Sequence, residues 1–321
     1  MKHSILMSVV WGLSLKLVLC SNAAWGQGYS FRTIDVPGAA QTVPEQNDVH
    51  GRIVGAYALQ DAANLTNGGQ GFELINGVFK TIDYPSASAT APSAINDAGE
   101  IVGVYFDNAG NFHGFLLSRG KFSAINYPGA ADTQALGINT PGEISGFYVS
   151  SDGANHGFTL SNGTFSTLDF PGALCTIAIG INDSSQIVGL YSLTDAAGCS
   201  NAQGFLYSAG SFSTIDFPGA SETSAGWINN HGEIVGDYIS GQSEEGFIFN
   251  SGTYTTLNFP GGTLTALLGV NDQGQIVGEY SDSSGGYRGF LATPFSGFSP
   301  VKMGSPHSYL NPRKPVSGSR Q

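Results

Sequence analysis

Basic residues are scarce in this sequence, and their scarcity argues against nucleic acid as a partner. Of 321 residues, 12 are Lys or Arg, and only 11% are charged. Residues 27–292 hold six of these cations against all 24 acids, which gives that part a formal charge of −18. A surface this acidic repels a phosphate backbone. We therefore expect no nucleic-acid function and interpret the charge as a solvated acidic surface.

Long apolar runs are missing except near the N-terminus. Ile5–Leu15 is an apolar run after a short basic start, Lys16 interrupts it, and small residues follow near Ala24. This pattern is typical of a secretory signal. We expect a signal peptide over residues 1–26 and export to the exterior, cell surface or periplasm, with a lipid anchor on Cys20 as the alternative. No later segment approaches the ~20 apolar residues that span a bilayer, so we expect no membrane span.

One pattern repeats six times along nearly the whole chain. Each copy contains an aromatic-x-x-Ile/Leu-Asp/Asn-x-Pro element, a turn after Asn or Asp, an Ile-Val/Ser-Gly-x-Tyr element and a Gly-Phe pair. The period of just over 40 residues is about the length of one four-stranded propeller blade. The first element of each copy starts at Phe31, Phe79, Phe122, Phe165, Phe212 and Tyr254.

The order of elements predicts how the ring closes. Both faces of Ile101–Tyr105 are apolar, as expected of a strand in a sheet packed between two others. The repeats begin with a lone fourth-strand element, Phe31–Pro37, and end with three strands through Leu291. Pairing the first with the last completes a sixth blade and removes two open edges. We predict an all-β, six-bladed β-propeller of four-stranded blades over residues 27–292; another closed β architecture and a linear solenoid are the alternatives.

Two of the Gly-Phe pairs carry a preceding His, in His113–Leu117 and His156–Phe158, downstream of Ile-Asn-x-x-Gly-Glu-Ile-Val/Ser-Gly. Over residues 31–292 the pattern resembles the HAF-repeat family of predicted extracellular bacterial proteins, named for a His-Ala-Phe motif. The resemblance implies export and a repeat fold. It implies no settled activity and no catalytic residue.

Two cysteines remain once the predicted signal is removed. Cys175 lies in the loop that enters the fourth blade, and Cys199 lies between that blade's second and third strands. Both loops belong to the same predicted face, and an exported protein meets oxidising conditions. We predict a Cys175–Cys199 disulfide; two unpaired thiols are the alternative.

Two rings of polar residues are candidate ligand-binding positions on the face with the loops of most variable length. The first ring has one Thr at the start of each inner strand. It is either a polar collar for an ion or a ligand hydroxyl, or a set of hydroxyls that satisfy local backbone groups. The Thr residues are Thr42, Thr90, Thr133, Thr176, Thr223 and Thr265. The second ring precedes each Gly-Phe pair and holds Gln70, His113, His156, Gln203, Glu245 and Arg288.

Signatures of catalysis and of cofactors are missing. The sequence has no Gly-x-Ser-x-Gly, no His-Glu-x-x-His and no phosphate-binding Gly-rich loop. His113 and His156 alone do not complete a metal site, so we predict no metal there. Loop acids could offer oxygens to calcium, but without EF-hand spacing, so we expect no cofactor. Those acids are Asp107, Asp152 and Asp282. Recurrent acids before the Pro turns are interpreted as scaffold; they are Asp35, Asp83, Asp169 and Asp216.

These observations favour a secreted, non-catalytic binding or scaffold propeller. Its ligand would be a glycan, a peptide or a cell-surface polymer, and we expect a monomer. The alternative is a secreted polysaccharide hydrolase or lyase with a site at the mouth of the central channel, which convergent acidic and aromatic side chains there would favour. Residues 293–321, with four cations and no acid, are predicted to be a basic, Pro/Ser/Gly-rich disordered tail.

Overall fold

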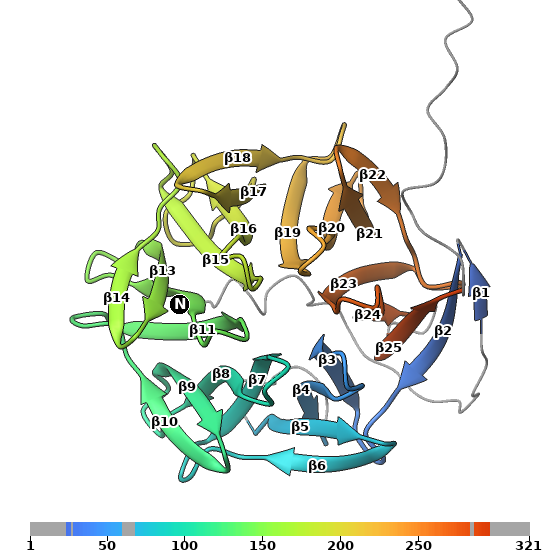
Figure 1. Cartoon of the computed structure of the whole chain (residues 1–321), viewed down its shortest axis with the longest axis horizontal. Coiled ribbons are helices and arrows are strands. Elements are labelled where there is room, and N and C mark those ends of the chain that lie inside the picture. Colours follow the sequence, from blue (N-terminus) through green and yellow to red (C-terminus); the bar gives the residue numbers. More distant parts are fainter. Residues whose placement is uncertain (1–23, 27, 60–67, 283–285, 296–321) are drawn as a thin grey trace, which may run out of the picture.

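Six β-sheets arranged in a ring form the protein (Figure 1). The computed structural model describes residues 24–26, 28–59, 68–282 and 286–295. This part contains only strands and turns, and it includes no helix that could span a membrane. The predicted six-bladed β-propeller is confirmed. Most of the predicted signal peptide and of the tail lies outside the described residues.

Five blades are consecutive antiparallel four-stranded sheets, each running from the channel to the rim. The first blade is β3(Gln41–Asn47), β4(Ile53–Ala58), β5(Gln70–Ile75) and β6(Val78–Ile82); the second is β7(Ala89–Ile95), β8(Ile101–Phe106), β9(Phe112–Ser118) and β10(Lys121–Ile125). The third is β11(Asp132–Ile138), β12(Ile144–Val149), β13(Asn155–Ser161) and β14(Thr164–Thr167). The fourth is β15(Cys175–Ile181), β16(Ile187–Ser192), β17(Gln203–Ser208) and β18(Ser211–Ile215); the fifth is β19(Glu222–Ile228), β20(Ile234–Ser240), β21(Ser243–Asn250) and β22(Thr253–Thr256).

The sixth blade joins the two ends of the repeat region, as predicted. Its inner three strands come from the end of the region, and β2 pairs antiparallel with β25, with Phe31 opposite Ala292. The short β1 adds a fifth strand beyond β2, and β25 reaches Pro294, two residues past the predicted boundary. The strands are β23(Leu264–Val270), β24(Ile276–Ser281), β25(Tyr287–Pro294), β2(Tyr29–Ile34) and β1(Ala24–Gly26).

The repeated Gly and Phe residues form the core of each blade. The Phe of every Gly-Phe pair is fully buried. Its ring lies over the Gly of the second strand: a Cβ on Gly146 would approach Phe158 Cζ to 2.8 Å. A larger residue than Gly at this position would therefore displace a fully buried ring.

Neighbouring blades are joined by stacked aromatic rings. The aromatic residue before each Pro turn stacks on the second-strand Tyr of the next blade, as Phe217 does on Tyr238 with centroids 3.6 Å apart. Five junctions carry such a pair, and at the sixth Val36 packs with Tyr57 instead. The five pairs are Tyr84–Tyr105, Tyr127–Tyr148, Phe170–Tyr191, Phe217–Tyr238 and Phe259–Tyr280.

Candidate functional site

A ring of asparagine side chains holds the inner strands together at one end of the channel. In the third blade, Asn139 Oδ1 accepts a hydrogen bond from the Glu143 backbone N–H at 2.7 Å. Its Nδ2 donates to the Asn182 carbonyl of the next blade at 3.1 Å. Each amide thus fixes its own turn and the neighbouring blade at once. The same bond to the next blade is made by Asn96, Asn139, Asn182, Asn229 and Asn271.

The first blade completes this ring with different residues. It has Asp48 where the other blades have Asn, and a carboxylate cannot donate to the next blade. Arg52 supplies the donors instead: Nε bonds the Asp48 carboxylate, and Nη2 donates to the Asp97 carbonyl at 3.2 Å. In the other blades the residue at the Arg52 position is Glu or Gln, which accepts a hydrogen bond from its Asn.

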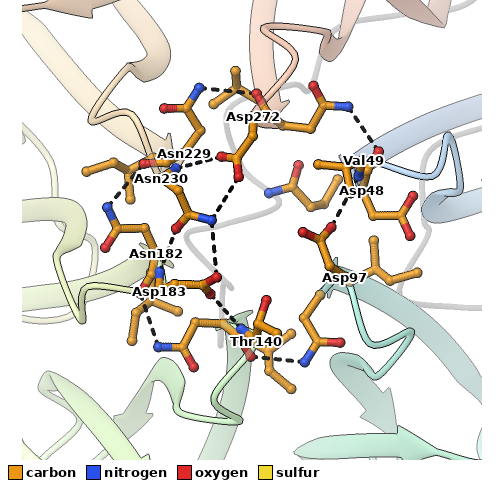
Figure 2. A pocket seen from close by; sticks show the side chains of 18 of the residues that line it. Asp48, Val49, Asp97, Thr140, Asn182, Asp183, Asn229, Asn230 and Asp272 are labelled. Carbon is orange, nitrogen blue, oxygen red and sulfur yellow. Dashed lines mark hydrogen bonds between the residues drawn. The ribbon is translucent and has the colours of Figure 1, made fainter.

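The residue after each of these positions lines the mouth of the channel, which is our candidate site (Figure 2). The cavity there measures about 60 Å³. Since roughly 10–15 Å³ holds one water, it admits only a few waters or the end of a side chain. Carboxylates come from the second, fourth and sixth blades and alternate with uncharged residues. In order around the ring, the six residues are Val49, Asp97, Thr140, Asp183, Asn230 and Asp272.

Hydrogen bonds across blade boundaries orient the three mouth carboxylates. Backbone N–H groups of Val49, Thr140 and Asn230 donate to Asp97, Asp183 and Asp272 at 3.2, 2.7 and 2.7 Å, respectively. The Asn230 amide also donates to Asp183 at 3.2 Å and to Asp272 at 2.9 Å. The carboxylates are therefore held in place before any ligand arrives, which lowers the entropy lost on binding.

The charge of the mouth is unbalanced. Within the described residues, no Lys, Arg or His forms an ion pair with Asp97, Asp183 or Asp272. No three acidic, His or Cys side chains of this part of the chain are placed to hold a metal ion. The three carboxylates surround the axis without converging on one point. Such an arrangement suits an organic cation, whose several N–H donors reach separate acceptors.

Sequence reasoning missed the mouth residues, although a signal for them exists. The Asn that precedes each mouth residue recurs in five copies of the repeat, and a recurring residue is interpreted as structural. The next position changes from copy to copy, from Val49 through Thr140 and Asn230 to three Asp. The ring geometry brings this position to the axis in every blade. A residue type that differs between copies at such a position is therefore the signal for a binding site.

The predicted Thr ring is present, and its hydroxyls bond to local backbone groups. Thr133 Oγ1 accepts the Tyr127 N–H at 2.9 Å, and the other five Thr residues accept the equivalent N–H. All six side chains are buried. The sequence left open whether these hydroxyls bind a ligand or satisfy local backbone groups, and the hydrogen bonds correspond to the second alternative. They tie each Pro turn to the start of the next inner strand.

The second predicted ring is half-buried, and its members bond within their own blades. The Tyr57 and Tyr191 hydroxyls donate to Gln70 and Gln203 at 2.6 and 2.8 Å. His156 Nδ1 lies 2.8 Å from the Asp169 carboxylate. The remaining partners are Asn126 and Asp107 for His113, Tyr238 and Asn258 for Glu245, and Asp35 and Asp282 for Arg288. The structure therefore places these residues in six separate clusters rather than in one site.

Two of the predicted calcium-ligand candidates are engaged in their own loops. The Asn111 side chain and backbone donate to Asp107, and these bonds lower the pKa of its carboxyl. The hydroxyl of Ser150 does the same for Asp152. Asp282 faces Arg288, with 3.6 Å between the carboxylate and Nε.

The predicted disulfide is confirmed. Cys175 and Cys199 are joined with Cα atoms 5.5 Å apart, and both residues are buried. The bond ties the start of β15 to the connection between β16 and β17. The disulfide stabilises this connection, which is the longest described loop on the face that carries the loops of variable length.

Four further acids lie between the fifth, sixth and first blades, two of them buried and two half-buried. Burial raises the pKa of Glu279 to about 7, and repulsion from Asp237 adds to the effect. Burial also raises the pKa of Glu45 to about 8, with a further contribution from the charge of Glu279. Burial and the charge of Glu222 raise the pKa of Asp237 to about 7. The side chains of Glu45 and Asp237 are partly exposed to solvent, although the chain surrounds their carboxyl groups.

The fourth of these acids is Glu244. Burial, together with Asp237 and Glu279, raises its pKa to about 10. One carboxyl oxygen each of Glu244 and Glu279 is buried without a hydrogen-bond partner. At neutral pH these groups therefore hold protons that an exposed carboxyl would have lost.

Comparison with known proteins shows the fold and nothing finer. No protein-family model matches the chain, and no curated protein matches it significantly. Among solved structures, TolB from Acinetobacter baumannii is similar with a TM-score of 0.52 and 18% identity, over 76% of this chain and 64% of that one. The chain thus spans less than two thirds of TolB.

Two other solved structures are similar to this chain at lower TM-scores. The Aleuria aurantia lectin in complex with Fucα1-6GlcNAc has a TM-score of 0.46 and 12% identity, over 86% of this chain and 100% of that one. The Pyrococcus horikoshii acylaminoacyl peptidase has a TM-score of 0.49 and 11% identity, over 78% of this chain and 44% of that one. At such identities the likeness is one of fold, and function has to be argued from the site.

Proposed function

We propose that this protein is a secreted, non-catalytic binding propeller that captures a peptide or cell-surface polymer by a cationic group at the channel mouth. The observation that carries the proposal is the mouth itself. Asp97, Asp183 and Asp272 surround a small opening, are oriented by neighbouring blades and have no basic partner among the described residues. An ammonium group on a flexible stem is small enough to enter and donates up to three hydrogen bonds.

The size and lining of the mouth favour binding over cleavage of a polysaccharide. A volume of about 60 Å³ leaves no room for a sugar ring between the carboxylates. No aromatic residue is among those that line the mouth, so a sugar has no platform to stack on. The mouth thus has acidic side chains, but these do not converge, and the aromatic side chains expected of the hydrolase alternative are not among those that line it.

The secreted location is part of the proposal. The Cys175–Cys199 disulfide is compatible with an oxidising compartment. The predicted signal segment and the resemblance to the HAF-repeat family support the same location.

Peptide and glycan arrays probed with the protein test this function. We expect hits that carry a primary amine, and loss of those hits with the D97N/D183N/D272N variant. The matched control is D83N/D169N/D216N, which removes the same charge on the opposite face at positions where the repeat also uses Asn126 and Asn258. Hits that survive the mouth substitutions, or that the protein cleaves, contradict the proposal.

A further inference from the structure

A second cavity lies where the ring closes, between the sixth and first blades. It measures about 320 Å³, within the range of small-molecule sites. The closing strand β2 contributes Arg32, β3 and its turn contribute Asn47 and His50, and apolar side chains include Ile53, Leu74 and Leu291. We call these six residues the closure cleft.

Asn47 breaks the repeat at this cleft. The other five blades have Ile or Val at its position, as at Ile95 and Val270, where the side chain fills the blade junction. Asn47 is 3% exposed; its Nδ2 donates to the Gln275 carbonyl at 3.3 Å, and its Oδ1 has no hydrogen-bond partner. Burying an unpaired acceptor is costly, so its presence where an apolar residue would fit calls for a donor. Asn47 is among the residues that line this cavity, so a hydroxyl of a bound ligand is a donor that could reach it there.

Arg32 breaks the repeat at the same cleft. Four of the other blades have Ser or Thr at its position, and the fifth has Lys80. Arg32 is exposed and forms no ion pair within the described residues, although 24 acids surround six cations in this part of the chain. Arg32 and His50 line the same cavity, and the guanidinium offers a fork of donors that matches a carboxylate.

The chemistry of the cleft defines a class of ligand. Arg32 and His50 suit a carboxylate, Asn47 Oδ1 accepts from a hydroxyl, and the buried side chains of Ile53 and Leu74 offer an apolar floor to a C–H face. We propose that the closure cleft binds a small hydroxylated carboxylate, the chemistry of a sugar acid. Such a ligand contacts both blades that meet at the closure, so its binding also stabilises the closed ring. Asn47 also lines the channel mouth, but the other five residues of the closure cleft do not, so this proposal does not rest on the function proposed for the mouth.

Titration calorimetry and thermal unfolding of the full chain with D-galacturonate and D-glucuronate test the proposal, with D-galactose and D-glucose as neutral probes. We expect a uronate to bind at least about tenfold more tightly than its neutral sugar, since one charge-assisted contact is lost in the latter. The same uronate should raise the unfolding midpoint. Oligouronides form a second arm: tighter binding of these than of the monomer identifies a polymer end as the source, and equal binding identifies a free acid.

Two substitutions that the repeat itself supplies make the test decisive. N47I installs the residue of the other blades, so the protein should fold at least as well and lose uronate binding. R32S should weaken uronate binding about tenfold and leave the weak neutral-sugar response unchanged. K80S, the same change at the next junction, is the control and should have no effect. Equal response to acid and neutral sugars, no response to either uronate, or unchanged binding by N47I would overturn the proposal.

Discussion

Arg52 binds the carboxylate of Asp48 where the other five blades pair an Asn with a Glu or Gln. The Asp48 side chain is fully buried, and the Arg52 side chain is 21% exposed. Both residues of the first blade differ from those of the other five blades. The hydrogen bond between strand and turn is kept, but the donor is now on the second residue of the pair and the acceptor on the first. The ring around the channel mouth thus closes through a substitution at two positions.

Loss of Arg52 should destabilise the ring. In R52A the buried Asp48 carboxylate has no counter-charge, and we expect a loss of about 3 kcal/mol in the free energy of unfolding. The double variant D48N/R52E recreates the pair found at Asn139 and Glu143 and should recover most of that loss. Urea denaturation measures both; an R52A protein as stable as the wild type would show that the pair is not structural.

The buried acids should make the protein less stable in mild alkali. In the unfolded chain these carboxyls lose their protons near pH 4, whereas in the folded chain Glu279 and Asp237 hold theirs to about pH 7 and Glu45 to about pH 8. Between those limits the folded state binds more protons, so stability falls as pH rises. We expect a lower free energy of unfolding at pH 8 than at pH 5.

Glu279 offers a matched test of this pH dependence. E279L installs the residue that Leu190 provides in the fourth blade. It should raise stability at pH 8 by about 2 kcal/mol and have a smaller effect at pH 5, where the wild-type carboxyl is protonated. Urea denaturation at the two pH values decides; equal effects at both would mean that packing rather than charge governs the site.

The disulfide should contribute to stability without touching the mouth. A crosslink over 24 residues is worth about 3 kcal/mol. C175S/C199S should lose roughly that amount and keep wild-type affinity for amine ligands, because the bond lies on the opposite face. A variant that keeps its stability but loses ligand binding would place the binding surface on the variable-loop face instead.

The Thr ring should matter for stability and not for binding. T133V removes one hydroxyl that accepts the Tyr127 N–H, and we expect a loss of about 1 kcal/mol. Calorimetry with the strongest array hit should give an unchanged affinity. Reduced affinity with unchanged stability would support the ligand collar that the sequence also allowed.

The sequence predicted the scaffold well because the scaffold recurs. Six copies of the Gly-Phe pair and the offset start at Phe31 were enough for the blade number and the closure, and two cysteines on one predicted face were enough for the disulfide. The sequence offered the channel mouth as the site of the hydrolase alternative, but it predicted neither the residues of the mouth nor the closure cleft. Asp97 and Asp272 are 175 residues apart in the chain, and only the ring brings them to one opening. Likewise, Asn47 is visible as an exception in the repeat, but its unpaired oxygen is visible only in three dimensions.

The most direct test of the channel mouth compares one ligand in two forms. The strongest amine-bearing peptide from the array is titrated into the wild type, first with its lysine free and then with the same lysine acetylated. We expect at least about tenfold weaker binding of the acetylated form, because acetylation removes the charge that the three carboxylates attract. We also expect D97N/D183N/D272N to bind the two forms equally. Equal affinity of the wild type for both forms would contradict the assignment of the mouth as the binding site.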